Sequence, residues 1–340
     1  MTPSSLFPIT EQSQIGEMRR KVASISDDIG FDAVLAGKIS IIVTEMATNI
    51  LKHADQGQII VSPITQAGIN GIELLALDKG PGMADIGRCF EDGYSTAGSQ
   101  GTGLGAITRQ SQEFDIYSQP GNGTVILARL WAAPVPPTEM MEIGAINIPF
   151  PGETRCGDAW AMLVQDGEYK IMVVDGLGHG LMASEAAMLA CAMFQDNPRA
   201  SPLEMVQIAH DGLRATRGAA MAVIHFIPEK NLARFAGAGN IAGNIIENTT
   251  SRGLASYNGI VGHQMVKLQE MTYPMADQAL LVMHSDGIAT RWNIASYPGL
   301  KMRHPSVIAG ILYRDFQRGH DDATVLVARL KEEKAVQKWV

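Results

Sequence analysis

The stretch IELLALDKGPGM, residues 72–83, decides how the first part of the chain folds. A mostly apolar run ends at Asp78, and Gly80, Pro81 and Gly82 follow at once, so a buried strand must end there in a tight turn. Glycine has no Cβ and accepts positive φ, which lets the backbone of such a turn approach a ligand closely. The stretch therefore predicts a strand whose terminal carboxylate faces a ligand.

Two amphipathic helices are expected before this strand. Apolar residues recur at spacings of three and four between residues 12 and 30 and again between residues 32 and 53, so each helix buries one face. On the second helix Glu45 and Asn49 lie one turn apart, beside the apolar stripe. Strands are expected at residues 58–64, 72–78, 114–117 and 124–131.

A glycine-rich loop, STAGSQGTGLGAI at residues 95–107, follows the turn. Gly101, Gly103 and Gly105 stand at the start of an expected helix, where free N–H groups and the helix dipole favour a phosphate. The loop is not a Walker A loop, because no GK[ST] follows, and no strand directly precedes it as in a dinucleotide fingerprint. The loop alone is weak evidence for a phosphate site, but its position after the Glu45–Asn49 pair and the glycine turn makes the order of motifs specific.

That order resembles the Bergerat-fold ATP-binding domains of the gyrase, Hsp90, histidine kinase and MutL superfamily. EMATNILKH, DKGPGM and GTGLG look like its N box and its two glycine boxes. The resemblance implies that Asp78 binds the adenine amino group, that Asn49 holds Mg²⁺ and that Glu45 is the general base. Guanine would present O6, a second acceptor, to that carboxylate. The nucleotide is expected to contact Asn49, Asp78, Gly80, Gly82, Met83, Gly101, Thr102, Gly103, Leu104, Gly105 and Thr124.

Residues 10–131 look most like the RsbT-type serine/threonine switch kinases, which phosphorylate STAS-domain antagonists. In such a kinase Glu45 deprotonates the attacking hydroxyl, while Mg²⁺ and the loop amides stabilise charge on the transferred phosphoryl group. A domain that binds ATP only as a structural ligand is the alternative.

A domain boundary is expected at WAAPVPPTEMMEIG, because its three closely spaced prolines fit neither a helix interior nor a central strand. The chain then divides into an ATP-binding domain at 1–131, a proline-rich linker at 132–142, a second domain at 143–330 and a charged tail at 331–340. The expected fold class is α/β (α+β), with an α/β sandwich followed by an α-β-β-α sandwich.

In the second domain four carboxylates stand at the edges of expected strands. Asp158 precedes AWAMLVQ, Asp175 ends YKIMVVD, and Asp286 and Asp321 flank later apolar runs. Each alone is explained by a turn or a helix cap. Together they could form an oxygen-only site for Mg²⁺ or Mn²⁺.

CGDAWAM, VVDGLGHG, GAGNI, SDGI and DDATVLV resemble, in this order, the metal-dependent protein phosphatases of the SpoIIE and RsbX group over roughly residues 143–330. The resemblance implies that Asp175 bridges two metals, Mn²⁺ or Mg²⁺. Gly176 would offer its carbonyl, Asp286 and Asp321 would complete one shell, and Asp158 would support the second metal. The ions would activate a water for attack on a phosphoserine or phosphothreonine.

Two assignments in this domain stay open. His179 either donates a proton to the leaving alkoxide or caps the following helix. Asp322, beside Asp321, could replace it as a ligand, although motif position favours Asp321.

Composition limits the partners. The 340-residue chain is 46% hydrophobic, carries a net charge of −8, and has no excess of Lys and Arg in either half, so nucleic acid and an anionic membrane are not expected partners. Three widely spaced cysteines and no secretory N-terminal pattern favour the cytoplasm.

The combined interpretation is a bifunctional switch that phosphorylates a STAS-domain regulator with ATP and dephosphorylates the same or a related protein in a partner-switching pathway. A phosphatase regulated by ATP binding, and a module that sequesters a sigma factor or antagonist, are the alternatives.

Overall fold

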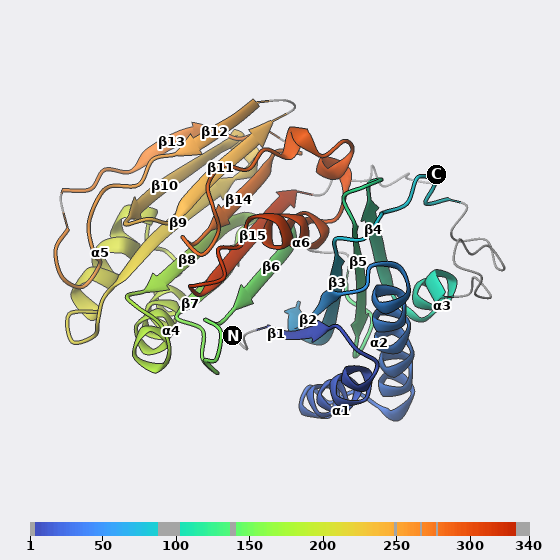
Figure 1. The fold of residues 1–340 in the computed structure, drawn as a ribbon. Coiled ribbons are helices and arrows are strands. Elements are labelled where there is room, and N and C mark those ends of the chain that lie inside the picture. Colours follow the sequence, from blue (N-terminus) through green and yellow to red (C-terminus); the bar gives the residue numbers. More distant parts are fainter. Residues whose placement is uncertain are drawn as a thin grey trace, which may run out of the picture. The chain divides into compact units, whose positions relative to one another are not determined.

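The computed structural model describes residues 4–87, 103–136, 141–247, 250–265, 267–276 and 278–330. Contacts divide the chain into two compact units. We call residues 2–139 together with 302–314 the N-terminal unit, and residues 140–301 together with 315–340 the C-terminal unit. Figure 1 labels the elements of both.

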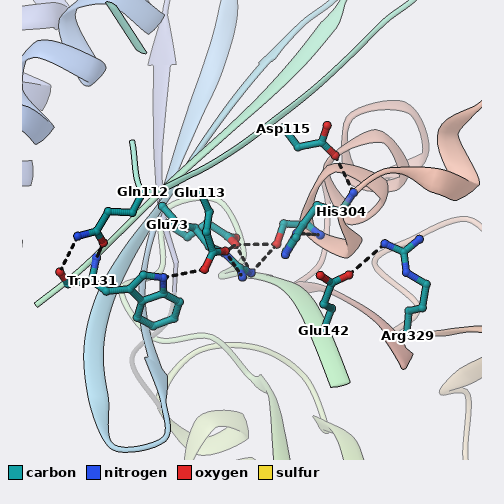
Figure 2. Close-up of polar contacts among 10 residues, drawn as sticks. Glu73, Gln112, Glu113, Asp115, Trp131, Glu142, His304 and Arg329 are labelled. Atoms are coloured by element: carbon teal, nitrogen blue, oxygen red, sulfur yellow. Dashed lines mark hydrogen bonds and ion pairs between the residues drawn. The ribbon is translucent and has the colours of Figure 1, made fainter. Parts of the chain in front are cut away.

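The N-terminal unit is built on one antiparallel sheet with the strand order β1-β2-β3-β5-β4. Its strands are β1 (Ser5–Ile9), β2 (Gly57–Gln66), β3 (Ile69–Asp78), β4 (Glu113–Ser118) and β5 (Thr124–Trp131). Trp131 Nε1 donates to Glu113 Oε1 at 2.9 Å, which ties β5 to β4 at the sheet edge (Figure 2). The four strands expected from the sequence are confirmed, and β1 is an additional one.

Helices α1 (Ser13–Asp28), α2 (Ala33–His53) and α3 (Gly103–Gln110) belong to the same unit. Asp32 caps α2 by accepting the Leu35 N–H at 2.8 Å. The stripe of apolar residues on α2 packs against the apolar side chains on one face of the sheet, as its spacing predicts. By length and composition α2 could also cross a membrane, a test that the core helix of a soluble protein passes too.

The other face of the sheet is also apolar, because every residue of β5 and nearly every residue of the second half of β3 is buried. Helix α6 (Pro305–Phe316) covers it within the N-terminal unit: a Cβ added at Gly310 would lie 3.0 Å from Val125 Cγ1 and 3.1 Å from Leu77 Cδ2. The sequence places residues 302–314 inside the second domain, whereas contacts group them with the first.

The C-terminal unit contains two five-stranded antiparallel sheets, in the orders β13-β10-β9-β8-β7 and β12-β11-β14-β15-β6 (Figure 1). Apolar side chains of both sheets meet in a shared core, and α4 (Leu181–Asp196) and α5 (Pro202–Gly212) pack on the first sheet. The strands of the first sheet are β7 (Asp158–Gln165), β8 (Glu168–Gly176), β9 (Ala219–Ile227), β10 (Leu232–Ala238) and β13 (Met271–Pro274).

The second sheet holds β6 (Met141–Ile148), β11 (Ala242–Glu247), β12 (Thr250–Leu254), β14 (Leu280–His284) and β15 (Ala323–Leu330). Arg329 Nη2 and Glu142 Oε2 form an ion pair at 3.1 Å between β15 and β6 (Figure 2). Strand β6 begins at Met141, inside the segment that the sequence marks as a linker. The expected mixed α and β class is confirmed for both units.

Two candidate active sites

Helix α2 presents Glu45 and Asn49 to the start of α3. Both side chains are half-buried. A Cβ added at Gly103 would lie 3.0 Å from Asn49 Oδ1 and 3.1 Å from Glu45 Oε2. The first residue of α3 therefore lies directly against this pair, and a larger residue there would displace one of the two side chains. The structure thus brings together the carboxylate, the amide and one glycine of the loop.

Asp78 ends β3, as expected, and its side chain is held by main-chain donors. Its Oδ1 accepts the N–H of Gly80 at 2.8 Å and that of Thr124 at 3.2 Å. Burial raises the pKa of Asp78, while these hydrogen bonds and the positive charges of Arg314 and His53 lower it. The carboxylate is thus oriented at the end of the strand.

Two glycines let the loop after Asp78 approach the turn before β5. Gly82 has φ +67°, and an added Cβ would lie 2.1 Å from the Gln119 carbonyl oxygen. Gly123 has φ +71°, and its added Cβ would lie 2.1 Å from the Asp78 carbonyl oxygen. Neither position has room for a side chain, which explains glycine at both.

The structure describes most of the other residues that are expected to contact the nucleotide. Thr124 Oγ1 lies 2.9 Å from Ser118 Oγ. The Met83 N–H donates to the same Ser118 Oγ at 2.8 Å. Met83 and Leu104 also pack against the core of the N-terminal unit. Gly80 and Gly105 lie in the loop and in α3 as expected, whereas Gly101 and Thr102 lie outside the described residues.

A carboxylate cluster forms the second site. Asp158 and Asp175 are directly opposite each other in the β7–β8 pair, so their side chains share one face of the sheet. Asp286 follows β14, and Asp321 precedes β15, the neighbouring strand. Gly176 ends β8 and packs against α4, where an added Cβ would lie 2.1 Å from the Ala183 carbonyl oxygen.

Asp158 is held on one side only. Ser285 Oγ donates to Asp158 Oδ2 at 2.6 Å, and Thr324 N–H donates to that Ser285 Oγ at 3.0 Å. Asn147 Nδ2 donates to the main-chain carbonyl oxygen of Asp158 at 3.1 Å and to Thr324 Oγ1 at 2.8 Å. The second carboxylate oxygen, Asp158 Oδ1, is buried and has no hydrogen-bond partner.

Burial and mutual repulsion make ionisation of these carboxylates unfavourable. Burial, followed by the repulsion of neighbouring carboxylates, raises the pKa of Asp175 to about 9. Burial in the same way raises the pKa of Asp158 to about 7 and raises the pKa values of Asp286 and Asp322. Such a cluster is stabilised when cations replace protons.

The residues fit a divalent cation by chemistry. Carboxylate and carbonyl oxygens are the donors that Mg²⁺ and Mn²⁺ prefer, and Asp158 Oδ1 is an oriented acceptor without a donor. Among the described residues, no three His, Cys, Asp or Glu side chains already enclose a single ion position. Asn240 Nδ2 binds Asp286 Oδ2 at 2.7 Å, and Asp322 Oδ1 accepts the Phe150 N–H at 2.8 Å.

His179 lies beside this cluster in sequence but binds another carboxylate. Its Nδ1 is 3.0 Å from Glu153 Oε1, and its ring stacks on Phe150 with centroids 4.2 Å apart. The N-cap residue of α4 is Gly180. The ring is therefore oriented by Glu153 and Phe150, and its proposed role as a proton donor stays a prediction.

Sequence reasoning missed the residues that orient the carboxylates. Ser285 and Asn240 donate to the carboxylates of Asp158 and Asp286, which are distant in the sequence, and Asn147 donates to the main-chain carbonyl of Asp158. Two of them carried a signal, because Ser285 directly precedes Asp286 in HSDGI and Asn240 lies in the GAGNI motif. The sequence gave no signal for Arg314, whose Nη1 donates to the main-chain carbonyl of Asp78.

Comparison with protein families finds one match in each half of the chain. Residues 8–130 match the histidine kinase-like ATPase domain, and residues 165–331 match stage II sporulation protein E (SpoIIE). The second match contains Asp175, Asp286 and Asp321, and it begins after Asp158.

The chain is similar to the serine/threonine-protein kinase RsbT of Bacillus subtilis (strain 168), with 34% identity over 131 residues, 38% of this chain and 98% of that kinase. A chain solved in work on "The bacterial stressosome: a modular system that has been adapted to control secondary messenger signaling" shares 28% identity. That match covers 56% of this chain and all of the other, with a TM-score of 0.53. RsbX in complex with magnesium shares 18% identity, covering 58% of this chain and 98% of RsbX, with a TM-score of 0.49.

Proposed function

Because the chain belongs to the RsbT family of serine/threonine-protein kinases and joins this kinase domain to a SpoIIE-type phosphatase domain, we propose that it is a bifunctional phosphorylation switch. The kinase half transfers phosphate from ATP to Ser or Thr of a STAS-domain regulator. The phosphatase half removes phosphate from the same or a related protein. The pathway is cytoplasmic partner switching, and the balance of the two rates sets the phosphorylated fraction.

The observation that carries the kinase proposal is the contact of Gly103 with Glu45 and Asn49. It supports a site in which Glu45 would act as the general base and Asn49 would hold Mg²⁺, next to Gly103 at the start of α3. In the reaction, Glu45 takes the proton from the substrate hydroxyl as the oxygen bonds to the γ-phosphorus and the bond to ADP breaks. Asp78 accepts a hydrogen bond from the adenine amino group, while Gly101 to Gly105 surround the triphosphate.

The carboxylate cluster supports the phosphatase proposal. Asp175, Asp286, Asp321 and the Gly176 carbonyl are the oxygens that would hold a pair of Mn²⁺ or Mg²⁺ ions, and Asp158 would support the second ion. Such ions supply positive charge and an activated water for attack on a phosphate ester. Ser285 binds Asp158 Oδ2 and Asn147 binds the main-chain carbonyl of Asp158, while Asp158 Oδ1 has no hydrogen-bond partner. His179, whose Nδ1 lies 3.0 Å from Glu153 Oε1, would return a proton to the leaving alkoxide.

The experiment uses γ-labelled ATP, Mg²⁺, Mn²⁺ and a STAS-domain protein encoded nearby, and compares the parent chain with Asp175→Ala. Label that accumulates only in the variant supports two opposed activities on one substrate. Equal labelling assigns the phosphatase a different target. No label in either chain contradicts the kinase proposal and favours a binding module, and an ATP-dependent phosphatase rate without labelling favours allosteric control.

A further inference from the structure

Helix α6 comes from the second half of the chain but packs within the N-terminal unit. Asp115, on β4, holds its beginning, because Oδ2 accepts the His304 N–H at 2.7 Å (Figure 2). Asp115 Oδ1 also accepts Arg303 Nη1 at 3.2 Å. The next contact is buried, since Ser306 Oγ donates to Glu73 Oε2 on β3 at 2.6 Å. The helix is thus fixed on the face of the sheet opposite α2.

Arg129 completes this buried contact. Its guanidinium lies 2.7 Å from Glu73 Oε2 and donates to Ser306 Oγ at 2.9 Å. The ion pair and the serine hydroxyl therefore satisfy one another away from water, which favours one position of α6 on the sheet.

The last turn of α6 reaches the candidate nucleotide site. Arg314 Nη1 donates to the main-chain carbonyl oxygen of Asp78 at 2.9 Å. The arginine is buried, with 8% of its surface exposed, so the guanidinium is not a solvated surface group that meets the carbonyl by chance. The close approach of Gly310 to Val125 and Leu77 brings this turn near the sheet.

Asp78 is the last paired residue of β3: it lies opposite Gly57 on β2 but has no partner on the β5 side. The β3–β5 pairing ends with Leu77 opposite Val125, one residue before Asp78. The N–H groups of Gly80 and Thr124 fix its side chain. Arg314, on α6, holds the main-chain carbonyl of Asp78.

We propose that Arg314 is a positioning residue of the nucleotide site, so that a site made from the first 131 residues is complete only with a helix from the second half of the chain. The inference rests on the proposed function, because it takes Asp78 as the residue that binds adenine. A charged donor on the Asp78 carbonyl holds the strand end, and with it the carboxylate, where the adenine amino group would bind.

The test measures binding of a fluorescent ATP analogue to the full-length chain. Arg314→Ala is expected to raise Kd about tenfold, the effect of losing one charge-assisted hydrogen bond. At saturating ATP, kcat for phosphoryl transfer stays at the parent value, because Arg314 does not touch the reacting atoms. Arg314→Lys keeps a single donor and recovers part of the affinity.

The pH dependence of binding gives a readout that general loosening of the helix would not move. Asp78 must be ionised to accept from adenine, and Arg314 and His53 are the positive groups that lower its pKa against the effect of burial. Without Arg314 the pKa of Asp78 rises further, so the loss of binding on acidification begins at a higher pH than in the parent. The titration of the analogue itself is the same for both proteins.

Arg303→Ala is the matched control, since it removes an arginine from the opposite end of the same helical segment. It is expected to bind nucleotide like the parent. Parent-like binding by Arg314→Ala, or an equal loss in Arg303→Ala, would overturn the inference. Asp78→Ala separates the two proposals: if that variant also binds like the parent, the nucleotide site itself has been placed wrongly.

Discussion

Asp158 and Asp175 face each other across the β7–β8 pair, and two carboxylates at that position repel one another. In antiparallel sheets, opposite charges or apolar pairs stabilise such a position, so this arrangement weakens the unit by itself. Natural proteins keep such costs at sites where a ligand relieves them. We therefore expect the C-terminal unit to be more stable with cations bound than without them.

Addition of Mn²⁺ should raise the melting temperature of the full chain by several degrees, because binding to the folded state alone adds about 2.7 kcal/mol at a hundredfold excess over Kd. Asp175→Asn should lose most of this increase and all metal-dependent hydrolysis of an aryl phosphate. Differential scanning calorimetry with and without a chelator measures the first effect. An unchanged increase in the variant would contradict the assignment of Asp175.

Ser285→Ala should weaken Mn²⁺ binding by about tenfold to a hundredfold, because loss of a hydroxyl that orients a metal-supporting carboxylate has effects of this size. Isothermal titration calorimetry measures the affinity directly. Ser285→Thr keeps the donor and should restore most of it. If Ala and Thr bind the ion equally well, the hydrogen bond to Asp158 has no part in metal binding.

Glu45→Gln should reduce phosphoryl transfer by about 10²- to 10⁴-fold, the contribution usual for a general base. Its affinity for nucleotide should stay within a few-fold of the parent, because the amide has the same shape and Asp78 is untouched. Labelling rates and binding of a fluorescent analogue are compared on the same preparation. A parent-like rate would exclude Glu45 as the base.

Gly103→Val should weaken nucleotide binding, since its Cβ would lie 3.0 Å from Asn49 Oδ1 and 3.1 Å from Glu45 Oε2 and both side chains would have to shift. Gly37→Ala, inside α2, is the contrasting variant because nothing lies within 4 Å of its added Cβ. It should bind normally and stabilise the chain by about 0.5–1 kcal/mol. Urea unfolding and analogue binding test both expectations.

Glu73→Ala should destabilise the N-terminal unit by about 3–5 kcal/mol, because Arg129 would remain buried without its partner. Glu73→Ala combined with Arg129→Met should recover much of this loss, since both charges are then absent. Arg214→Ala, which breaks an exposed ion pair, should cost less than about 1 kcal/mol. Chemical unfolding of the three variants provides the comparison.

Local patterns predicted the N-terminal unit well. Helical spacing gave α1 and α2, and the run ending at Asp78 gave β3, because hydrophobic periodicity depends on neighbours within a turn or a strand. Motif order gave the resemblance to RsbT-type kinases and SpoIIE-type phosphatases, which the comparisons confirm. These inferences need no knowledge of distant contacts.

The sequence did not predict contacts between residues that are far apart along the chain. Ser306 is 233 residues from Glu73, and Ser285 is 127 residues from Asp158. One signal was present for α6: IELLALD and TVILARLW are apolar on both faces, which in a sheet requires a cover on each side. The sequence did not say which segment supplies that cover, since many apolar helices would fit.

The position of α6 determines how this gene can be divided. A gene truncated in the proline-rich stretch would still encode every nucleotide motif. Its protein would leave Leu75, Leu77 and Val125 exposed to water, and Arg129 would lose its hydrogen bond to Ser306. Exchange of modules between genes at that boundary would likewise separate the kinase from its own last helix. A cut at that boundary would therefore remove a helix that the kinase domain packs against, although the motifs of the two enzymes lie in succession along the chain.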